Sequence, residues 1–360
     1  MNQPVPADVL QPNKLAEVLE QLDECSFPHW FEDFEKIAIR GVSVEIPENA
    51  LEYLRDEIVV LPKECYPSEN SVDNRNKVID LTTLDALDAD DKSEEDEIRQ
   101  PEYPEFSKRI TKAIAQLKGG VAFLKTNWHC PKDAFWITAG QTLQVKDITD
   151  VYQLLKASSI VKQDLNRHGL PDRIVDVPDS QLIHKTTDKH FIVLKEWHEI
   201  HPGTEFRCFV RRRSLIAISP RDWPAYHEDI VQQKRDICMD IRSIFRERIK
   251  EQFPLDSFVF DVVRVAKDVV LLVDFSPFNE LTTDPLAFDW IELNDERMFL
   301  ENDDPEFRYL PNDCGIQPSK RNNYGIPIDI IDMFNGNSVD IGNFLRDGRH
   351  SDMCSPDALL

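Results

Sequence analysis

Short apolar or alternating runs recur along the chain and predict β-strands. In one of them, EFRCFV at 205–210, Glu205 and Arg207 fall on one face, and the apolar residues Phe206 and Cys208 fall on the other. That strand should bury one face and present charge on the opposite one. The remaining predicted strands are 42–46, 121–125, 190–197 and 214–219.

Apolar residues three or four positions apart predict helices. The longest, from about Glu228 to Gln252, carries isoleucines at helical spacing, which is typical of a core helix. Another, Glu105 to Lys118, ends at Gly119-Gly120, a suitable helix C-terminus. Shorter elements are helices at 15–22 and 150–156 and a loop through Pro171 and Pro178.

The stretch FVFDVVRVAKDVVLLVDFSPF, residues 258–278, predicts a β-hairpin around a turn at Lys267 and Asp268. Counting from that turn pairs residue 266 with 269 and 265 with 270, and it places Asp261 opposite Asp274. Directly opposed carboxylates lie about 5 Å apart at Cβ and repel each other, more strongly where water is excluded. The aspartate pair therefore requires a positive partner.

Two interpretations of this pair stand side by side. In the first, the aspartates hold Mg²⁺, which prefers oxygen ligands, often takes one or two carboxylates and bridges to nucleotide phosphates. Ser276, two residues beyond Asp274 and on its face, would add a third oxygen. In the second, one aspartate pairs with Arg264 or Lys267 and the other is exposed at a sheet edge.

The absence of the two common phosphate-binding motifs limits the kinds of nucleotide site that the chain can form. The chain has neither G-x-x-x-x-G-K-[ST] nor G-x-G-x-x-G, so P-loop and Rossmann sites lack their motifs. Positive residues on strands and adjoining loops remain. Each one alone is more often a solvated charge, but their common placement beside carboxylates gives them weight together. These residues are Lys125, Lys132, Lys195, Arg207 and Arg221.

Other catalytic patterns are weak. The segment WHEIH offers His198, Glu199 and His201, but it lacks H-E-x-x-H spacing and lies at a strand end, so a plain loop is favoured over zinc. No G-x-S-x-G is present, and the seven scattered cysteines include no Cys-x-x-Cys pair. We therefore expect reduced thiols and assign no catalytic residue.

Composition limits the partners. The 360 residues are 41% hydrophobic and carry a formal net charge of -24, which argues against non-specific binding to nucleic acid or anionic membranes. There is no apolar run of roughly 18 residues that would span a bilayer. We expect a cytoplasmic, monomeric protein whose partner is another protein.

Part of the charge falls in DALDADDKSEEDE at 85–97, where too little apolar surface is present to offset the entropy of ordering. A solvated linker is favoured there, and an acidic patch for a basic partner is the alternative. The expected fold class is α+β, with antiparallel sheets and flanking helices. Its parts are a polar lead-in (1–24), an N-terminal part (25–65), a disordered acidic insertion (66–100), a core (101–347) and a polar tail (348–360).

In order and spacing, eight blocks resemble the cell division cycle protein 123 (D123) family. The blocks are CSFPHWF, the acidic insertion, PEYPEF, FLKTNWHCPKDAFWI, VLKEW, EFRCFV, ISPRDW and the hairpin strands FVFDVVRV and LLVDFSPF. The resemblance covers residues 25 to about 290, and a weaker resemblance is found in the run PIDIIDMF. It implies an ATP-grasp-like fold that binds ATP with Mg²⁺ and serves as an assembly chaperone of eukaryotic translation initiation factor 2, engaging its gamma subunit.

The resemblance also implies roles for individual residues. Nucleotide-contacting positions are matched by Lys125, Cys130 and Lys132, and the strand and hinge beside adenine by Lys195, Glu196, Trp197 and His198. Ribose- or phosphate-side positions are matched by Glu205, Arg207 and Arg221. Magnesium ligands are matched by Asp261, Asp274 and Ser276. The family commonly has Asn at the position of Ser276, a basic residue at that of Glu196, and Arg at those of Lys132 and Lys195.

Two functions from different classes fit these features. In the first, ATP and Mg²⁺ order a surface that holds a client subunit during assembly, with slow or no hydrolysis. In the second, the protein is an ATP-grasp ligase that activates a carboxylate as an acyl phosphate and joins it to an amine. The sequence offers no acceptor pocket for ligation, so the chaperone is favoured.

Overall fold

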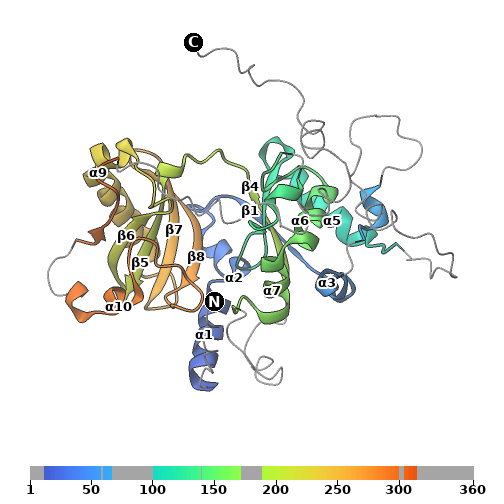
Figure 1. The fold of residues 1–360 in the computed structure, drawn as a ribbon, viewed down its shortest axis with the longest axis horizontal. Coiled ribbons are helices and arrows are strands. Elements are labelled where there is room, and N and C mark those ends of the chain that lie inside the picture. The colour runs from blue at the N-terminus through green and yellow to red at the C-terminus, as the bar shows by residue number, and fades with distance from the viewer. Residues whose placement is uncertain are drawn as a thin grey trace, which may run out of the picture.

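The computed structural model describes residues 12–57, 60–66, 100–138, 140–171, 189–299 and 304–313. Two sheets lie side by side in this part of the chain, and helices flank each of them (Figure 1). The expected α+β class with antiparallel sheets is confirmed, with one parallel pair, β6 with β9, at an edge. None of the described helices is long and apolar enough to cross a membrane. Residues 67–99 of the predicted insertion (66–100), the run PIDIIDMF and the tail at 348–360 lie outside the described residues.

The first sheet has the strand order β1-β4-β2-β3. Strand alternation sends Leu124 and Leu194 into a core with helices, and it sends their neighbours Lys125 and Lys195 to the face directed at the second sheet. Its strands are β1 (Gly41–Glu45), β2 (Ala122–Lys125), β3 (Gln144–Val145) and β4 (Phe191–Glu196).

Four helices cover the outer face of the first sheet (Figure 1). Each contributes buried apolar residues to one core with the strands, such as Leu54, Ile110, Leu154 and Leu165, all fully buried. The helices predicted at 105–118 and 150–156 are present, but the first ends at Ala115 and Lys118–Gly120 forms a separate 3₁₀ turn. Two further short helices were not predicted. The four are α3 (Glu48–Arg55), α5 (Pro104–Ala115), α6 (Ile148–Ala157) and α7 (Ser159–Arg167).

The second sheet has the order β8-β7-β5-β6-β9. One face packs on the long helix α9 (Glu228–Ile244), which continues as a π turn, Phe245–Ile249, rather than as α-helix to residue 252. The other face carries Arg207 and Asp261, as the alternation in EFRCFV predicted, and part of it is covered by α10 (Trp290–Leu293). The strands are β5 (Glu205–Arg211), β6 (Ser214–Pro220), β7 (Phe258–Ala266), β8 (Val269–Pro277) and β9 (Glu306–Phe307). Single 3₁₀ turns cover Lys63–Cys65, Lys118–Gly120, Phe135–Ile137, Pro202–Thr204 and Glu296–Phe299.

The β7–β8 hairpin places Asp261 directly opposite Asp274, as predicted. The register between them and the turn differs from the prediction. Arg264, not Val265, pairs with Val270, and a second shift between Asp261 and Val262 restores the count. Val265 is bulged out and 61% exposed, so two compensating irregularities produce the predicted pair.

The N-terminal segment joins the two halves. Helix α1 (Pro12–Glu24) buries Leu15, Val18, Leu19 and Leu22 in a cluster with Leu170 and Leu281, so the second half of the predicted polar lead-in is a packed helix. The aromatic helix α2 (Phe27–Phe34) contributes to the core of the second sheet. Residues 37–39 then cover the outer edge of β8 through backbone bonds to Leu272.

Candidate functional site

Arg207 and Asp261 form a buried ion pair across β5 and β7, where they are cross-strand neighbours. Arg207 Nε and Nη2 donate to the two oxygens of Asp261, both at 2.8 Å, and Nη1 donates to the carbonyl of Asp284 at 2.9 Å. Only 8% of each side chain is exposed. A two-pronged pair of this kind holds the aspartate in one orientation.

The second aspartate of the hairpin, Asp274, pairs with the first sheet. Lys125, at the end of β2, forms an ion pair with Asp274, and the ammonium of Lys195 on β4 donates to the carbonyl of Val273. Val273 has no partner of its own on β7 because of the register shift beside it. The β8 edge of the second sheet therefore meets two lysines of the first.

Arg221, directly after β6, contacts two of the carboxylates on β5 and β7. Its Nη1 lies 3.6 Å from Asp261 Oδ2, and its Nε lies 3.7 Å from Glu205 Oε1. The structure thus brings together seven of the residues predicted from the sequence. We call them the cation–carboxylate cluster: Lys125, Lys195, Glu205, Arg207, Arg221, Asp261 and Asp274.

The electrostatics of this cluster favour an anion. Within the cluster four cationic side chains face three carboxylates, and Asp284 outside it also acts on Arg221, whereas the whole chain has a net charge of -24. Burial lowers the pKa of Lys195 to about 8, against the opposing effect of Asp274. Burial disfavours the charged form of Asp261, but Arg207 and Arg221 outweigh it and the pKa of Asp261 is lowered. An anionic ligand would stabilise the charged form of Lys195.

The loop between β2 and the turn at Phe135, residues 126–133, carries Cys130 and begins directly after Lys125 of the cluster. Burial raises the pKa of the Cys130 thiol, while Lys132, Lys125 and Arg221 act on it in the opposite direction through their charges. Cys130 therefore lies within electrostatic range of two cluster residues. Lys132, two residues after Cys130, is exposed.

The other predicted residues lie on, or in the segments just after, the strands that carry the cluster. Ser276 is two residues beyond Asp274 and is opposite Val259. Glu196, Trp197 and His198 continue from Lys195 at the end of β4, where Glu196 lies 3.5 Å from His198. His201 accepts a bond from the Gly203 N–H at 3.2 Å and packs against His227, so the two histidines of WHEIH have separate neighbours.

Comparison with known proteins decides the family. The family model described as D123 matches residues 30–334, and a Xenopus tropicalis protein is 36% identical over 324 residues, covering 88% of this chain and 92% of its own length. The chain belongs to the D123 family. The family assignment made from the eight sequence blocks is confirmed.

Two relatives agree with this chain in length, and one solved structure agrees with it in fold. The Xenopus tropicalis protein and a Danio rerio protein, 35% identical over 326 residues and covering 88% of this chain and 90% of that one, are both named translation initiation factor eIF2 assembly protein. The solved structure of Cdc123 from Schizosaccharomyces pombe superposes with a TM-score of 0.61 at 30% identity. It covers 85% of this chain and 100% of its own.

The donor set of the D123 chain fits magnesium bound together with a polyphosphate. Asp261 accepts one short bond at each oxygen, and an ionised carboxylate has about four lone-pair sites, so both aspartates retain capacity for a cation. Among the described residues no three His, Cys, Asp or Glu side chains form a metal cage. Magnesium does not require one, since it is usually bound by one or two carboxylates plus phosphate oxygens and water.

The partners of the aspartates differ from the second interpretation of the sequence. Arg264 pairs with Asp240, with Nε to Oδ2 at 2.6 Å, and Lys267 lies 3.9 Å from Asp236. Neither cation of the hairpin therefore neutralises Asp261 or Asp274. The cations that do so come from β2, β5 and β6, which are distant in sequence.

Two residues that hold the loop in place were missed. Asn127 is 1% exposed, donates to Ser26 Oγ at 3.0 Å and accepts from the Phe191 N–H at 2.7 Å. Asp164 on α7 is also 1% exposed and binds Thr126 and His129. Asn127 lies in the block FLKTNWHCPKDAFWI that carries the family resemblance, whereas Asp164 lies in a segment without any motif.

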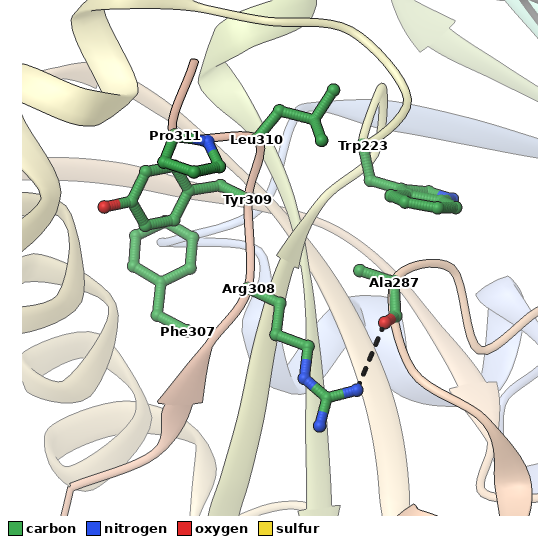
Figure 2. A pocket seen from close by; sticks show the side chains of 7 residues that line it. All are labelled: Trp223, Ala287, Phe307, Arg308, Tyr309, Leu310 and Pro311. Carbon is green, nitrogen blue, oxygen red and sulfur yellow. Dashed lines mark hydrogen bonds between the residues drawn. The ribbon is translucent and has the colours of Figure 1, made fainter. Parts of the chain in front are cut away.

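A separate pocket of about 360 Å³ lies where the chain leaves β9 (Figure 2). Its walls are mainly apolar, and the Arg308 guanidinium in it reaches across to the Ala287 carbonyl at 3.3 Å and to Glu292 at 2.7 Å. Because this cation is already paired, the pocket is a poor phosphate site. Its lining residues are Trp223, Ala287, Phe307, Arg308, Tyr309, Leu310 and Pro311, of which none belongs to the cation–carboxylate cluster.

Proposed function

We propose that this protein binds ATP with Mg²⁺ in the cation–carboxylate cluster and acts in the assembly of translation initiation factor eIF2 by engaging its gamma subunit. The assembly role is supported by membership of the D123 family and by the names of the Xenopus and Danio relatives. The nucleotide role is supported by the cluster itself. An ATP-grasp-like fold, in which a nucleotide binds between two sheets, agrees with the side-by-side sheets of this chain.

The observation that carries the nucleotide role is the convergence of cations from both sheets on one pair of aspartates. Lys125 and Lys195 come from the first sheet, whereas Arg207 and Arg221 come from the second. A lysine ammonium has three donors, and in the described structure Lys195 uses one of them on Val273. The ammonium also lies 5.2 Å from the centroid of the Phe27 ring and 5.9 Å from that of the Trp30 ring, and its other two donors are the ones that we assign to phosphate oxygens.

Each residue has a definite part in this proposal. The phosphates are held by Lys125, Lys132, Lys195, Arg207 and Arg221, and Glu205 lies on the ribose side. Asp261, Asp274 and Ser276 hold Mg²⁺, which neutralises phosphate charge when bound. The main chain of 196–198 and the side chain of Cys130 border the base and sugar. The bound ligand would bridge the two sheets and so stabilise their relative position.

The test is calorimetric titration of the full chain with ATP, with Mg²⁺ and with EDTA. We expect saturable binding at one site that is weakened in EDTA. Capture of purified eIF2 gamma subunit with and without ATP then tests the assembly role. Absence of ATP binding in folded protein would refute the nucleotide role. Release of ADP and phosphate in step with an amide-joined product would replace the chaperone by a ligase.

A further inference from the structure

Helix α7 binds both ends of loop 126–133. At one end, Asp164 accepts from Thr126 Oγ1, from the His129 N–H at 3.1 Å and from His129 Nδ1 at 2.7 Å. At the other end, Asp133 accepts from the N–H groups of Ser159 and Ile160 at 2.8 and 3.2 Å, and from Ser158 Oγ at 2.6 Å. One short helix therefore fixes the distance between the two ends of the loop.

The residues just after the C-terminal end of α7 also contact the ring of Trp128. Gly169 has φ +78° and lies so close that a Cβ there would be 3.1 Å from the indole. Trp128 Nε1 in turn donates to the Leu22 carbonyl of α1 at 2.7 Å. The ring thus holds the middle of the loop against both helices.

The tip of the loop, Cys130 to Lys132, lies between these attachments. The Lys132 N–H donates to the Cys130 carbonyl at 2.8 Å, which makes the tip a tight turn. The loop begins directly after Lys125, the cluster residue at the end of β2, so one end of the loop is attached to the cation–carboxylate cluster. The charges of Lys125 and Arg221 also act on the Cys130 thiol of the tip. Displacement of either attached end would move the tip relative to those cations.

We propose that Asp133 and Asp164 are positioning residues: through α7 they hold Cys130 and Lys132 at the nucleotide site. This inference rests on the proposed nucleotide function. The physical reason is that Asp164, 1% exposed, is the shared acceptor for three donors of the loop. Without that acceptor the His129 ring loses its partner, and Thr126 Oγ1 and the His129 N–H keep only their bonds to each other's residue within the loop, which favours other arrangements of the loop.

The experiment compares full-length variants at both ends of the loop. Asp164→Leu removes all three acceptor bonds at similar volume, and Asp133→Ala removes the bonds to α7 at the more accessible end. Asp164→Asn is the conservative variant, because its amide can serve the same groups if His129 changes tautomer. Asp147→Ala is the matched control: Asp147 caps α6 by accepting from Thr149 and Asp150 N–H groups, away from the loop.

The first measurement is the alkylation rate of Cys130 without nucleotide, followed by peptide mass spectrometry. We expect an increase of about tenfold in Asp164→Leu and in Asp133→Ala, and no change in Asp164→Asn or Asp147→Ala. Unchanged rates in both disrupting variants would overturn the inference. Asp133→Ala, the less buried change, keeps this measurement decisive if Asp164→Leu does not fold.

The second measurement is the affinity for ATP with Mg²⁺. A loss of about tenfold that accompanies faster alkylation supports the positioning role. Faster alkylation with unchanged affinity, in a protein that binds ATP, would overturn it. If the unmodified protein binds no ATP, the proposed function fails, and the arrangement of the loop is still judged by the alkylation rates alone.

Discussion

Replacing Arg207 with Met should destabilise the fold more than most single substitutions. Arg207 and Asp261 are each 8% exposed and share two bonds of 2.8 Å, so the variant leaves a buried carboxylate with Arg221 at 3.6 Å as its nearest remaining cation. Breaking one side of a buried pair typically costs about 3–5 kcal/mol, and Arg221 places this case at the lower end, about 3 kcal/mol. We expect Asp261→Asn alone to cost about 2 kcal/mol.

A double-mutant cycle isolates the pair. Because Arg207→Met with Asp261→Asn removes both charges, the double variant should cost about 2–3 kcal/mol rather than the sum, a coupling of about 2–3 kcal/mol. The assay is urea unfolding of the full chain followed by tryptophan fluorescence. Additivity of the two single variants within about 0.5 kcal/mol would refute the reasoning.

The pH dependence has a defined sign. The pKa of Asp261 is lowered in the folded protein, because Arg207 and Arg221 outweigh the opposing effect of burial. The stability that it contributes is therefore complete above the unfolded pKa of about 3.9 and is lost as pH falls through the folded value. The difference between the unmodified protein and Arg207→Met should shrink at acidic pH.

Arg264→Met provides a matched control, since Arg264 forms a comparably buried pair with Asp240 outside the cluster. Arg264→Met should lower the free energy of unfolding by about as much as Arg207→Met does, and it should leave the affinity for ATP with Mg²⁺ unchanged. Equal loss of affinity in both arginine variants would mean that Arg207 acts only through stability.

Four further outcomes are expected. Asp274→Asn should abolish magnesium-dependent ATP binding while the far-UV spectrum stays native, and unchanged affinity would remove Asp274 from the metal site. Ser276→Asn should tighten ATP binding by up to about tenfold, or roughly 1.4 kcal/mol, because the amide oxygen reaches farther than the hydroxyl. The gain must vanish in EDTA if Ser276 faces the ion. Because the pKa of Lys195 is lowered to about 8 by burial, ATP affinity should fall as pH rises through 8, and Lys195→Arg should flatten that fall. Parallel pH profiles of the two proteins would contradict this assignment. Deletion of residues 84–98 should leave the melting temperature within a few degrees, since the charged block buries little apolar surface. A larger drop would show that the block is packed.

Local periodicity was sufficient to predict the strands that form the site. The charged face of β5 follows from alternation alone, and it correctly sets Arg207 apart from the apolar residues on either side. The opposition of Asp261 and Asp274 was also predicted, although the two shifts between them were not. Those shifts have no local signature, because they accompany contacts such as Lys195 to Val273 that form only when the sheets meet.

The parts that sequence reasoning missed depend on contacts between distant segments. The second interpretation gave one aspartate Arg264 or Lys267 as its partner because these lie in the same hairpin, but the observed partners come from other strands. Short helices such as α7 were missed because a stripe of two or three apolar residues is too short to establish a period. Asp164 has no motif, and its importance comes only from Thr126 and His129, which lie 38 and 35 positions away.

Helix α1 has a mechanical consequence for any movement between the sheets. Its leucines contact Leu170, which follows α7 in the first half of the molecule, and Leu281, which follows β8 in the second, while its last turn accepts the Trp128 bond. A hinge motion that separated β4 from β8 would have to break the contacts of α1 with either Leu170 or Leu281. The N-terminal helix thus braces the two halves of the molecule at a place remote from the Lys125–Asp274 and Lys195–Val273 contacts, so separation of the sheets requires both sets of contacts to break.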